Sequence, residues 1–257
     1  MIIKIWDSGC AACGAPQSLE RVATLLLIGN CELDDWHYEA AIFSYSAAIK
    51  LDPDNAEIYR QKAEAFYEND DIASSTLDWS RVIDLIEHDD EPSEDELYEA
   101  YRTRANLHNE QGFYDLAIDD YDYYISNFGY TSLDLYWRAG ALVESGRLES
   151  AISDYSTVID ACTPTVEDWC LEARAKAYLC IGEYHRAIDD YSELIERKKI
   201  SYPSALGRIY FDRAVTYYEA GRYNEAFEGF TTAIELNPDR DDAYEYQTRA
   251  RDAGLGE

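Results

Sequence analysis

The side chains best suited to chemistry in this sequence are cysteines and histidines. Cys10 and Cys13 form a single CxxC motif. With Cys31 and His37 they supply the ligand types of a Cys3His zinc site. No second CxxC pair follows, and Cys31 falls in the turn of a helical repeat described below. We therefore interpret Cys10 and Cys13 as two thiols of an N-terminal tail, and we expect no metal and no cofactor.

The other histidines and the sequence motifs give no sign of catalysis. His88, His108 and His185 lie far apart in the sequence, so their spacing assembles no catalytic group. The sequence contains no GxxxxGK[ST], HExxH or GxSxG motif. The usual signatures of phosphate binding, zinc proteolysis and serine hydrolysis are therefore missing. We expect no catalytic residues and predict that the protein is not an enzyme.

The charge is strongly acidic. The 257 residues include 52 acidic and 22 basic side chains, which gives a formal net charge of −30. Such a surface repels phosphate backbones, so we expect no nucleic-acid partner. It either keeps the protein soluble or attracts a basic partner. No run of 18 apolar residues occurs, and the opening MIIKIWDSGC is too short for a secretory signal. We therefore expect no membrane partner and a cytoplasmic location.

The elements that carry these side chains follow a pattern that occurs six times. Each copy has a small residue, another small residue twelve positions later, an aromatic residue four after that and an isoleucine four further on. The second small residues are Ala41, Ser75, Ala117, Ala151, Ala187 and Ala226, and the aromatic residues are Tyr45, Trp79, Tyr121, Tyr155, Tyr191 and Phe230. Apolar residues at spacings of three and four predict two helices in each copy. Glycines at 112, 146, 182 and 221 are expected in the turns between them. A repeat of this length indicates a solenoid.

The pattern resembles the tetratricopeptide repeat family. Copies that carry the resemblance include YWRAGALVESGRLESAISDYSTVI and LEARAKAYLCIGEYHRAIDDYSELI. The resemblance implies an all-α fold, a right-handed superhelical solenoid of antiparallel helix pairs. We place a tail of uncertain structure at 1–19 and the solenoid at 20–257. The expected repeats are about 22–55, 56–89, 98–131, 132–165, 168–201 and 207–240, with a capping helix at 241–253.

A recurring basic residue and a recurring aspartate predict ion pairs between packed helices. They could pair within a repeat or between neighbouring repeats. We favour pairing between neighbours. Gly229 replaces the last aspartate, and the next position of the basic series is Gln247, so under this scheme no arginine there lacks a partner. The predicted pairs, with a structural role, are Asp78–Arg104, Asp120–Arg138, Asp154–Arg174 and Asp190–Arg213.

The resemblance also implies a binding face, because the first helices of such repeats line a concave surface that holds a peptide or a helix. The predicted partner-binding residues are Arg60, Arg102, Asn106, Tyr136, Trp137, Trp169, Lys176, Phe211 and Tyr218. Large aromatic groups on an open face are typical of interaction sites. The alternative is that these rings pack on one another. The carboxylate clamp of chaperone-binding members is not expected, because Trp137, Trp169 and Ala173 occupy three of its positions.

We therefore predict a non-catalytic protein–protein interaction module that binds a segment or helix of a partner, possible roles being adaptor, chaperone or scaffold. The alternative is an acidic inhibitor or decoy that acts through its outer surface on a basic or nucleic-acid-binding partner. The acidic segment 88–96 is interpreted as a solvated loop, because it lacks the alternating ligands and central glycine of a calcium loop. The sequence leaves the oligomeric state open.

Overall fold

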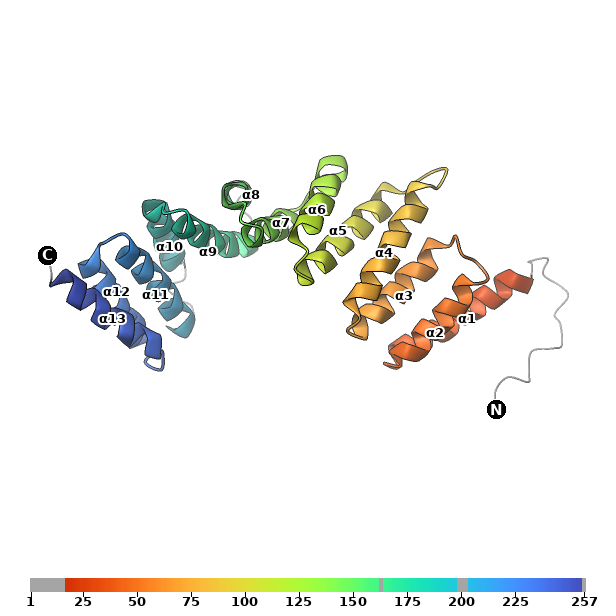
Figure 1. Cartoon of the computed structure of the whole chain (residues 1–257), viewed down its shortest axis with the longest axis horizontal. Coiled ribbons are helices and arrows are strands. Elements are labelled where there is room, and N and C mark those ends of the chain that lie inside the picture. The colour runs from red at the N-terminus through yellow and green to blue at the C-terminus, as the bar shows by residue number, and fades with distance from the viewer. Residues whose placement is uncertain (1–16, 162–163, 198–202, 256–257) are drawn as a thin grey trace. The chain divides into compact units, whose positions relative to one another are not determined.

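The computed structural model describes residues 17–161, 164–197 and 203–255 (Figure 1). Every regular element within these ranges is an α-helix. The chain divides into two compact units, Met1–Phe128 and Gly129–Glu257, and each is described by itself. Cys10 and Cys13 lie outside the described residues, so their predicted role stays a prediction.

The first unit is a stack of three helix pairs. Its helices are α1 (Gln17–Asp34), α2 (Tyr38–Ile49), α3 (Ala56–Glu68), α4 (Ile72–Glu87), α5 (Glu94–Glu110) and α6 (Tyr114–Phe128). Each helix packs on the next up to α6. Tyr45 and Tyr121 are fully buried beside Ala41 and Ala117, because the small residues let the two helices of a pair approach closely.

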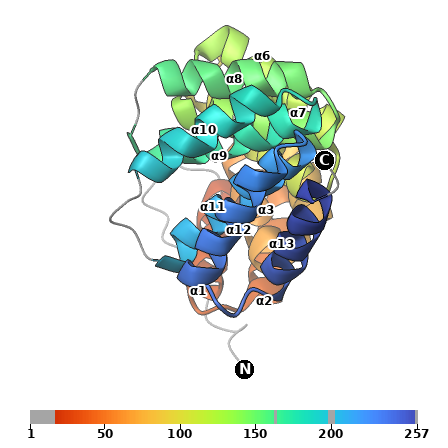
Figure 2. The same cartoon turned by 90° about the vertical axis from the view of Figure 1, so that its left-hand side faces the viewer.

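The second unit contains three more pairs and one final helix. Its helices are α7 (Ser132–Glu144), α8 (Leu148–Asp160), α9 (Pro164–Cys180), α10 (Tyr184–Arg197), α11 (Pro203–Glu219), α12 (Tyr223–Leu236) and α13 (Asp241–Gly254). Figure 2 shows α11, α12 and α13 side by side, and α13 packs chiefly on α12. Both units have the all-α helical-repeat solenoid fold that the sequence predicted.

The turns inside the pairs use the left-handed backbone conformation that glycine adopts without strain. As predicted, Gly112, Gly146, Gly182 and Gly221 lie in these turns, with φ between 73° and 80°. The first two pairs place other residues there. Trp36 has φ 65° and Asp70 has φ 62°, so these two turns carry a conformational strain that the other four avoid.

The ion pairs form within repeats, so the predicted pairing between neighbours is wrong. Arg104 binds Asp120 through two nitrogens at 2.9 and 2.6 Å. The other pairs are Arg138–Asp154 at 2.7 Å, Arg174–Asp190 at 2.7 Å and Lys62–Asp78 at 3.1 Å. In each case a residue of the first helix meets a residue of the second helix of the same pair.

A third nitrogen of Arg104 and of Arg174 reaches the preceding repeat, where it meets a serine hydroxyl. Nη1 of Arg104 donates to Ser80 at 3.2 Å, and Nη1 of Arg174 donates to Ser156 at 2.9 Å. Gln247 of α13 fills the equivalent slot and donates to Thr231 at 2.8 Å. Hydroxyl groups therefore help to join these neighbouring repeats.

Arg213 explains why the pairing prediction failed. The prediction assumed that every arginine of the series has a carboxylate partner. Among the described residues Arg213 has none; it donates to Ser192 at 3.0 Å and lies over the rings of Tyr210 and Tyr217. No aspartate stands at position 229, where a Cβ would come within 2.8 Å of the Ala214 Cβ.

Candidate functional site

The first unit contains a cleft between its first helices α3 and α5, with α4 beneath. It consists of two adjoining hollows of about 460 and 510 Å³ that share Glu57, Arg60, Trp79 and Glu99. The sequence pattern explains the geometry, because each first helix turns a polar face away from the core side that packs on its partner helix. The second helix α4 contributes the side chains between the two walls.

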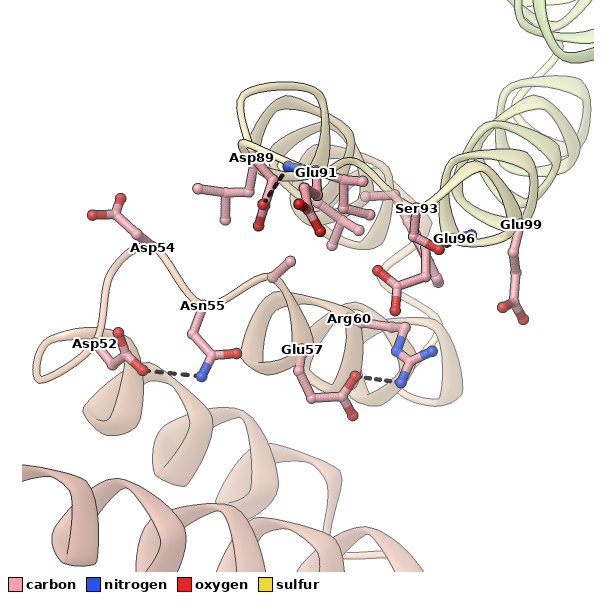
Figure 3. Close-up of a pocket in the computed structure, with 15 residues that line it drawn as sticks. Asp52, Asp54, Asn55, Glu57, Arg60, Asp89, Glu91, Ser93, Glu96 and Glu99 are labelled. Atoms are coloured by element: carbon pink, nitrogen blue, oxygen red, sulfur yellow. Dashed lines mark hydrogen bonds and ion pairs between the residues drawn. The ribbon is translucent and has the colours of Figure 1, made fainter. Parts of the chain in front are cut away.

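The floor of the cleft is apolar and its walls are acidic. Trp79, Val82 and Ile86 of α4 line it and are buried. The carboxylates in the lining are Asp52, Asp54, Glu57, Glu64, Asp89, Glu91, Glu96, Glu99 and Glu110. Figure 3 shows the acidic side chains of one hollow arriving from α3, from α5 and from the connections before each of them. Nine carboxylates thus face a single basic side chain, that of Arg60.

The charge of Arg60 is already neutralised. Its guanidinium is paired with Glu57 one helical turn away (Figure 3). The other oxygen of Glu57 accepts a hydrogen bond from Nε2 of Gln61 at 2.6 Å. Arg60, which the sequence predicted as a partner-binding residue, is therefore occupied by a neighbour, and the cleft as a whole carries a negative potential.

Two buried oxygen atoms in the cleft have no hydrogen-bond partner. Ser75 is fully buried, lines the cleft, and its Oγ is unpartnered. Oε1 of Gln61, in the same lining, is also unpartnered. Unsatisfied buried polar atoms are rare because each costs about 1–3 kcal/mol. These two atoms point to a missing donor.

Two other predicted residues of this unit differ in their placement. Asn106 lines the cleft, and its Oδ1 accepts a hydrogen bond from the Tyr121 hydroxyl at 2.6 Å. The guanidinium of Arg102 lies 5.6 Å from the centre of the Tyr98 ring, outside the lining of either hollow. The structure thus brings Arg60 and Asn106 together in the cleft and leaves Arg102 beside it.

The second unit presents an aromatic face on α7 and α9. The Tyr136 ring lies 5.3 Å from that of Trp137 and 5.9 Å from that of Trp169. Trp137 is 43% exposed and Trp169 is 48% exposed, while burial raises the pKa of Tyr136. The three rings therefore pack on one another, as the alternative interpretation expected, and two of them still offer a large apolar surface to solvent.

A network of charges links α9 to α11. Arg208 donates to both oxygens of Glu172, at 2.5 and 2.7 Å, and Lys176 donates to Glu172 at 2.7 Å. The hydrogen bond from Arg208, with help from Lys176, lowers the pKa of Glu172 to about 2. Lys176, a predicted partner-binding residue, is 53% exposed at its side chain but is engaged in this network.

Phe211 requires a correction, because α12 and α13 cover it, whereas Tyr218 is half-buried. Phe211 is only 6% exposed and contacts the rings of Phe230 and Tyr246. The guanidinium of Arg240 lies 3.7 Å from the centre of its ring. The Tyr218 ring contacts the rings of Tyr246 and of Tyr223, the first residue of α12. Phe211 belongs to the core of the last repeat, and Tyr218 packs at its margin.

The sequence prediction overlooked two important residues of the cleft. Glu99 lines both hollows, and Ser75 supplies the unpartnered hydroxyl. A signal for Ser75 was present in the sequence, because five of the six repeats have alanine in that slot. No comparable signal distinguished Glu99 from the many other exposed acids.

Metal binding and membrane insertion find no support in the described part of the chain. It holds no group of three or more His, Cys, Asp or Glu side chains placed to bind a metal ion. Among the same residues, no helix combines the length and the apolar character needed to cross a membrane.

Comparisons with known proteins agree with the observed architecture. Residues 37–70 match a family model described as TPR repeat, and residues 207–240 match one described as tetratricopeptide repeat. No curated protein matches the sequence.

Solved structures share the fold at low sequence identity. YrrB, a TPR protein with an unusual peptide-binding site, is 15% identical, with a TM-score of 0.62 over 79% of this chain and 97% of its own. MamA from Desulfovibrio magneticus RS-1 is 13% identical, with a TM-score of 0.59 over 71% of this chain and 97% of its own. A tetratricopeptide repeat protein from Parabacteroides merdae is 20% identical, with a TM-score of 0.51 over 90% and 84%. Two segments of this chain thus match tetratricopeptide repeat models, and the chain shares the helical-repeat fold of solved tetratricopeptide repeat proteins.

Proposed function

We propose that this protein is a non-catalytic interaction module that binds a peptide segment or helix of a partner protein along its first helices, as an adaptor, chaperone or scaffold. The observation that carries the proposal is the cleft of the first unit, which has an apolar floor and polar walls from two helices. Such a combination suits a peptide, because the floor accepts aliphatic groups while the walls fix polar ones. The cytoplasm remains the location that we propose, on the sequence grounds given above.

The aromatic face of the second unit supports the same function. Trp137 and Trp169 leave nearly half of their surface exposed, and the packing of Tyr136 between α7 and α9 holds them in place. Tryptophan and tyrosine are frequent energetic anchors of protein interfaces, each contributing about 2 kcal/mol or more when they form a hot spot. We propose these three residues as a contact surface for a partner protein.

The experiment that tests this function is a selection of peptides from a random twelve-residue library displayed on phage, with the full chain as bait. Selected peptides are then titrated by calorimetry against Thr103→Trp, which fills the cleft, and Asp119→Trp, which places the same ring on the exposed side of α6. We expect Thr103→Trp to abolish binding of cleft ligands and Asp119→Trp to preserve it.

A second class of selected peptides tests the aromatic face. These peptides should lose binding to a Trp137→Ala/Trp169→Ala variant whose circular dichroism matches that of the wild type. A library that yields no peptide sensitive to either change contradicts the proposed function.

The acidic decoy is a second candidate, and one observation favours it. Most basic side chains are engaged in internal ion pairs, including Arg81, Arg222 and Arg249, which lie near the surface. The excess carboxylates therefore dominate the field outside the molecule. Reversing exposed acids of the second helices to lysine should abolish binding of a partner attracted in this way, whereas binding in the cleft should tolerate those changes.

A further inference from the structure

We propose that the cleft of α3, α4 and α5 binds a basic segment of a partner protein, and that one arginine or lysine side chain of this segment donates a hydrogen bond to Ser75. This inference rests on the proposed function and names the chemistry of its ligand.

The first argument is charge complementarity. Of the ten charged side chains in the lining, nine are acidic, and the tenth, Arg60, is paired with Glu57. Glu64 and Glu99 are exposed in the cleft and form no ion pair with a described residue. An acidic ligand would meet repulsion along the whole cleft, whereas a cation gains attraction from both walls.

The second argument is independent of charge and concerns hydrogen bonding at the floor. The Ser75 hydroxyl is fully buried and without a partner, and Oε1 of Gln61 is also a buried acceptor without a donor. Both lie in the same lining. Oε1 of Gln61 can only accept, and the Ser75 hydroxyl can accept as well as donate, so the several donors of a guanidinium or ammonium group can serve both atoms, whereas a carboxylate has no donor for Gln61. Together with the acidic walls, this favours a cationic side chain.

The third argument is the form of the cleft. Its lining extends from Asp52, before α3, to Glu110, at the end of α5. The carboxylates are spread along this length, which suits an extended ligand with separated positive charges. The methylene stems of lysine and arginine also suit the apolar floor around Trp79, because they bury apolar surface while the charged end reaches a polar group.

The test uses calorimetry on the full chain at physiological salt with two probe peptides. One has twelve residues that alternate arginine and alanine, and the other replaces each arginine with neutral citrulline. We expect the arginine peptide to bind at least about tenfold more tightly than the citrulline peptide, because only the former complements the walls.

Matched variants separate the cleft from the general charge of the protein. Glu64→Gln/Glu99→Gln removes two negative charges from the cleft, and Glu39→Gln/Asp119→Asn removes two from exposed positions on α2 and α6. The cleft variant should weaken binding of the arginine peptide about tenfold, while the control stays within about twofold. Equal losses in both variants would overturn the proposal, because they indicate diffuse attraction to the whole surface.

Ser75→Ala tests the hydrogen bond at the floor. Alanine occupies this slot in five of the six repeats, so the variant should fold, with a thermal midpoint equal to or above that of the wild type. Affinity for the arginine peptide should nevertheless fall about three- to tenfold, as expected for the loss of a hydrogen bond to a charged group. Unchanged affinity would refute the role of Ser75. None of these results affects the proposed function, which fails only when the peptide selection yields no peptide whose binding is lost in Thr103→Trp or in the Trp137→Ala/Trp169→Ala variant.

Discussion

Lys62 Nζ lies 3.1 Å from Oδ1 of Asp78, while Oδ2 of the same carboxylate is buried without a hydrogen-bond partner. In the equivalent place Arg104 binds both oxygens of Asp120. The ammonium group of lysine cannot span two oxygens as the planar guanidinium does. Burial raises the pKa of Asp78 despite its lysine partner.

The first prediction is that Lys62→Arg stabilises the protein. The guanidinium should reach both oxygens of Asp78 and satisfy the buried acceptor, which raises the free energy of unfolding by about 1 kcal/mol. Chemical denaturation followed by circular dichroism measures this change. Arg138→Lys serves as the reverse control and should destabilise its pair, since it removes the two-nitrogen contact with Asp154. A loss of stability in Lys62→Arg would contradict this explanation.

The second prediction concerns the close approach of α11 and α12. A Cβ at position 229 would lie 2.8 Å from the Ala214 Cβ, so Gly229→Ala forces the two helices apart. We expect a destabilisation of about 1–3 kcal/mol. Gly140→Ala is the matched control, because a Cβ there meets no atom within 4 Å and helix propensity alone should stabilise it by about 0.5–1 kcal/mol. Equal thermal midpoints for the two variants would argue against a contact at Gly229.

The third prediction concerns the strained turn between α3 and α4. Asp70 has φ 62° in a position that four other repeats give to glycine. Asp70→Gly should stabilise the protein by about 0.5–1 kcal/mol, because glycine adopts this conformation without a steric penalty. The reverse change, Gly146→Ala, should destabilise by a similar amount. Thermal unfolding of both variants tests the pair of expectations, and a destabilised Asp70→Gly would show that the aspartate side chain has another role.

The fourth prediction is a pH dependence of the contact between α9 and α11. Arg208 lowers the pKa of Glu172 to about 2, below its usual 4.5. A carboxyl group with a lowered pKa stabilises the fold above its unfolded pKa, and this contribution disappears as the pH falls from about 4 towards 2. Because the Arg208 side chain is 43% exposed, we expect roughly 1 kcal/mol at neutral pH.

Glu172→Gln measures that contribution. The variant should be less stable than the wild type at pH 7, and the difference should shrink between pH 4 and pH 3 in urea titrations. Glu149→Gln, at an exposed position of α8, should show no such difference at either pH. A gap between wild type and Glu172→Gln that stays constant with pH would refute the assignment.

The parts of this protein that could be predicted from its sequence are those that depend on local spacing. Helix pairs and turn glycines follow from residues three to sixteen positions apart, and the structure has them. The partner of Arg104 could not be predicted by the same means. Ser80 precedes Arg104 in the sequence and Asp120 follows it. Only the packing of the helices decides that Asp120 accepts hydrogen bonds from two nitrogens of Arg104 and Ser80 from one.

The candidate site was harder to predict than the fold. The choice of Phe211 failed because α13 covers it, which depends on how a terminal helix packs and not on the pattern of the repeat itself. Arg60 was chosen for its charge, although Glu57 one turn earlier neutralises it. The sequence therefore identified the residues of the first helices, but the exposure of their side chains and their ion-pair partners could be read only from the structure.

The division of contacts around Arg174 has a mechanical consequence. Two of its nitrogens bind Asp190 within the pair of α9 and α10, and one reaches Ser156 on α8. A force that draws successive repeats apart breaks a single hydroxyl bond at this point and leaves the carboxylate contacts whole. At the junction of α8 and α9 the pair of α9 and α10 then moves as one body, so a stretched second unit should open there before the contact between Arg174 and Asp190 breaks.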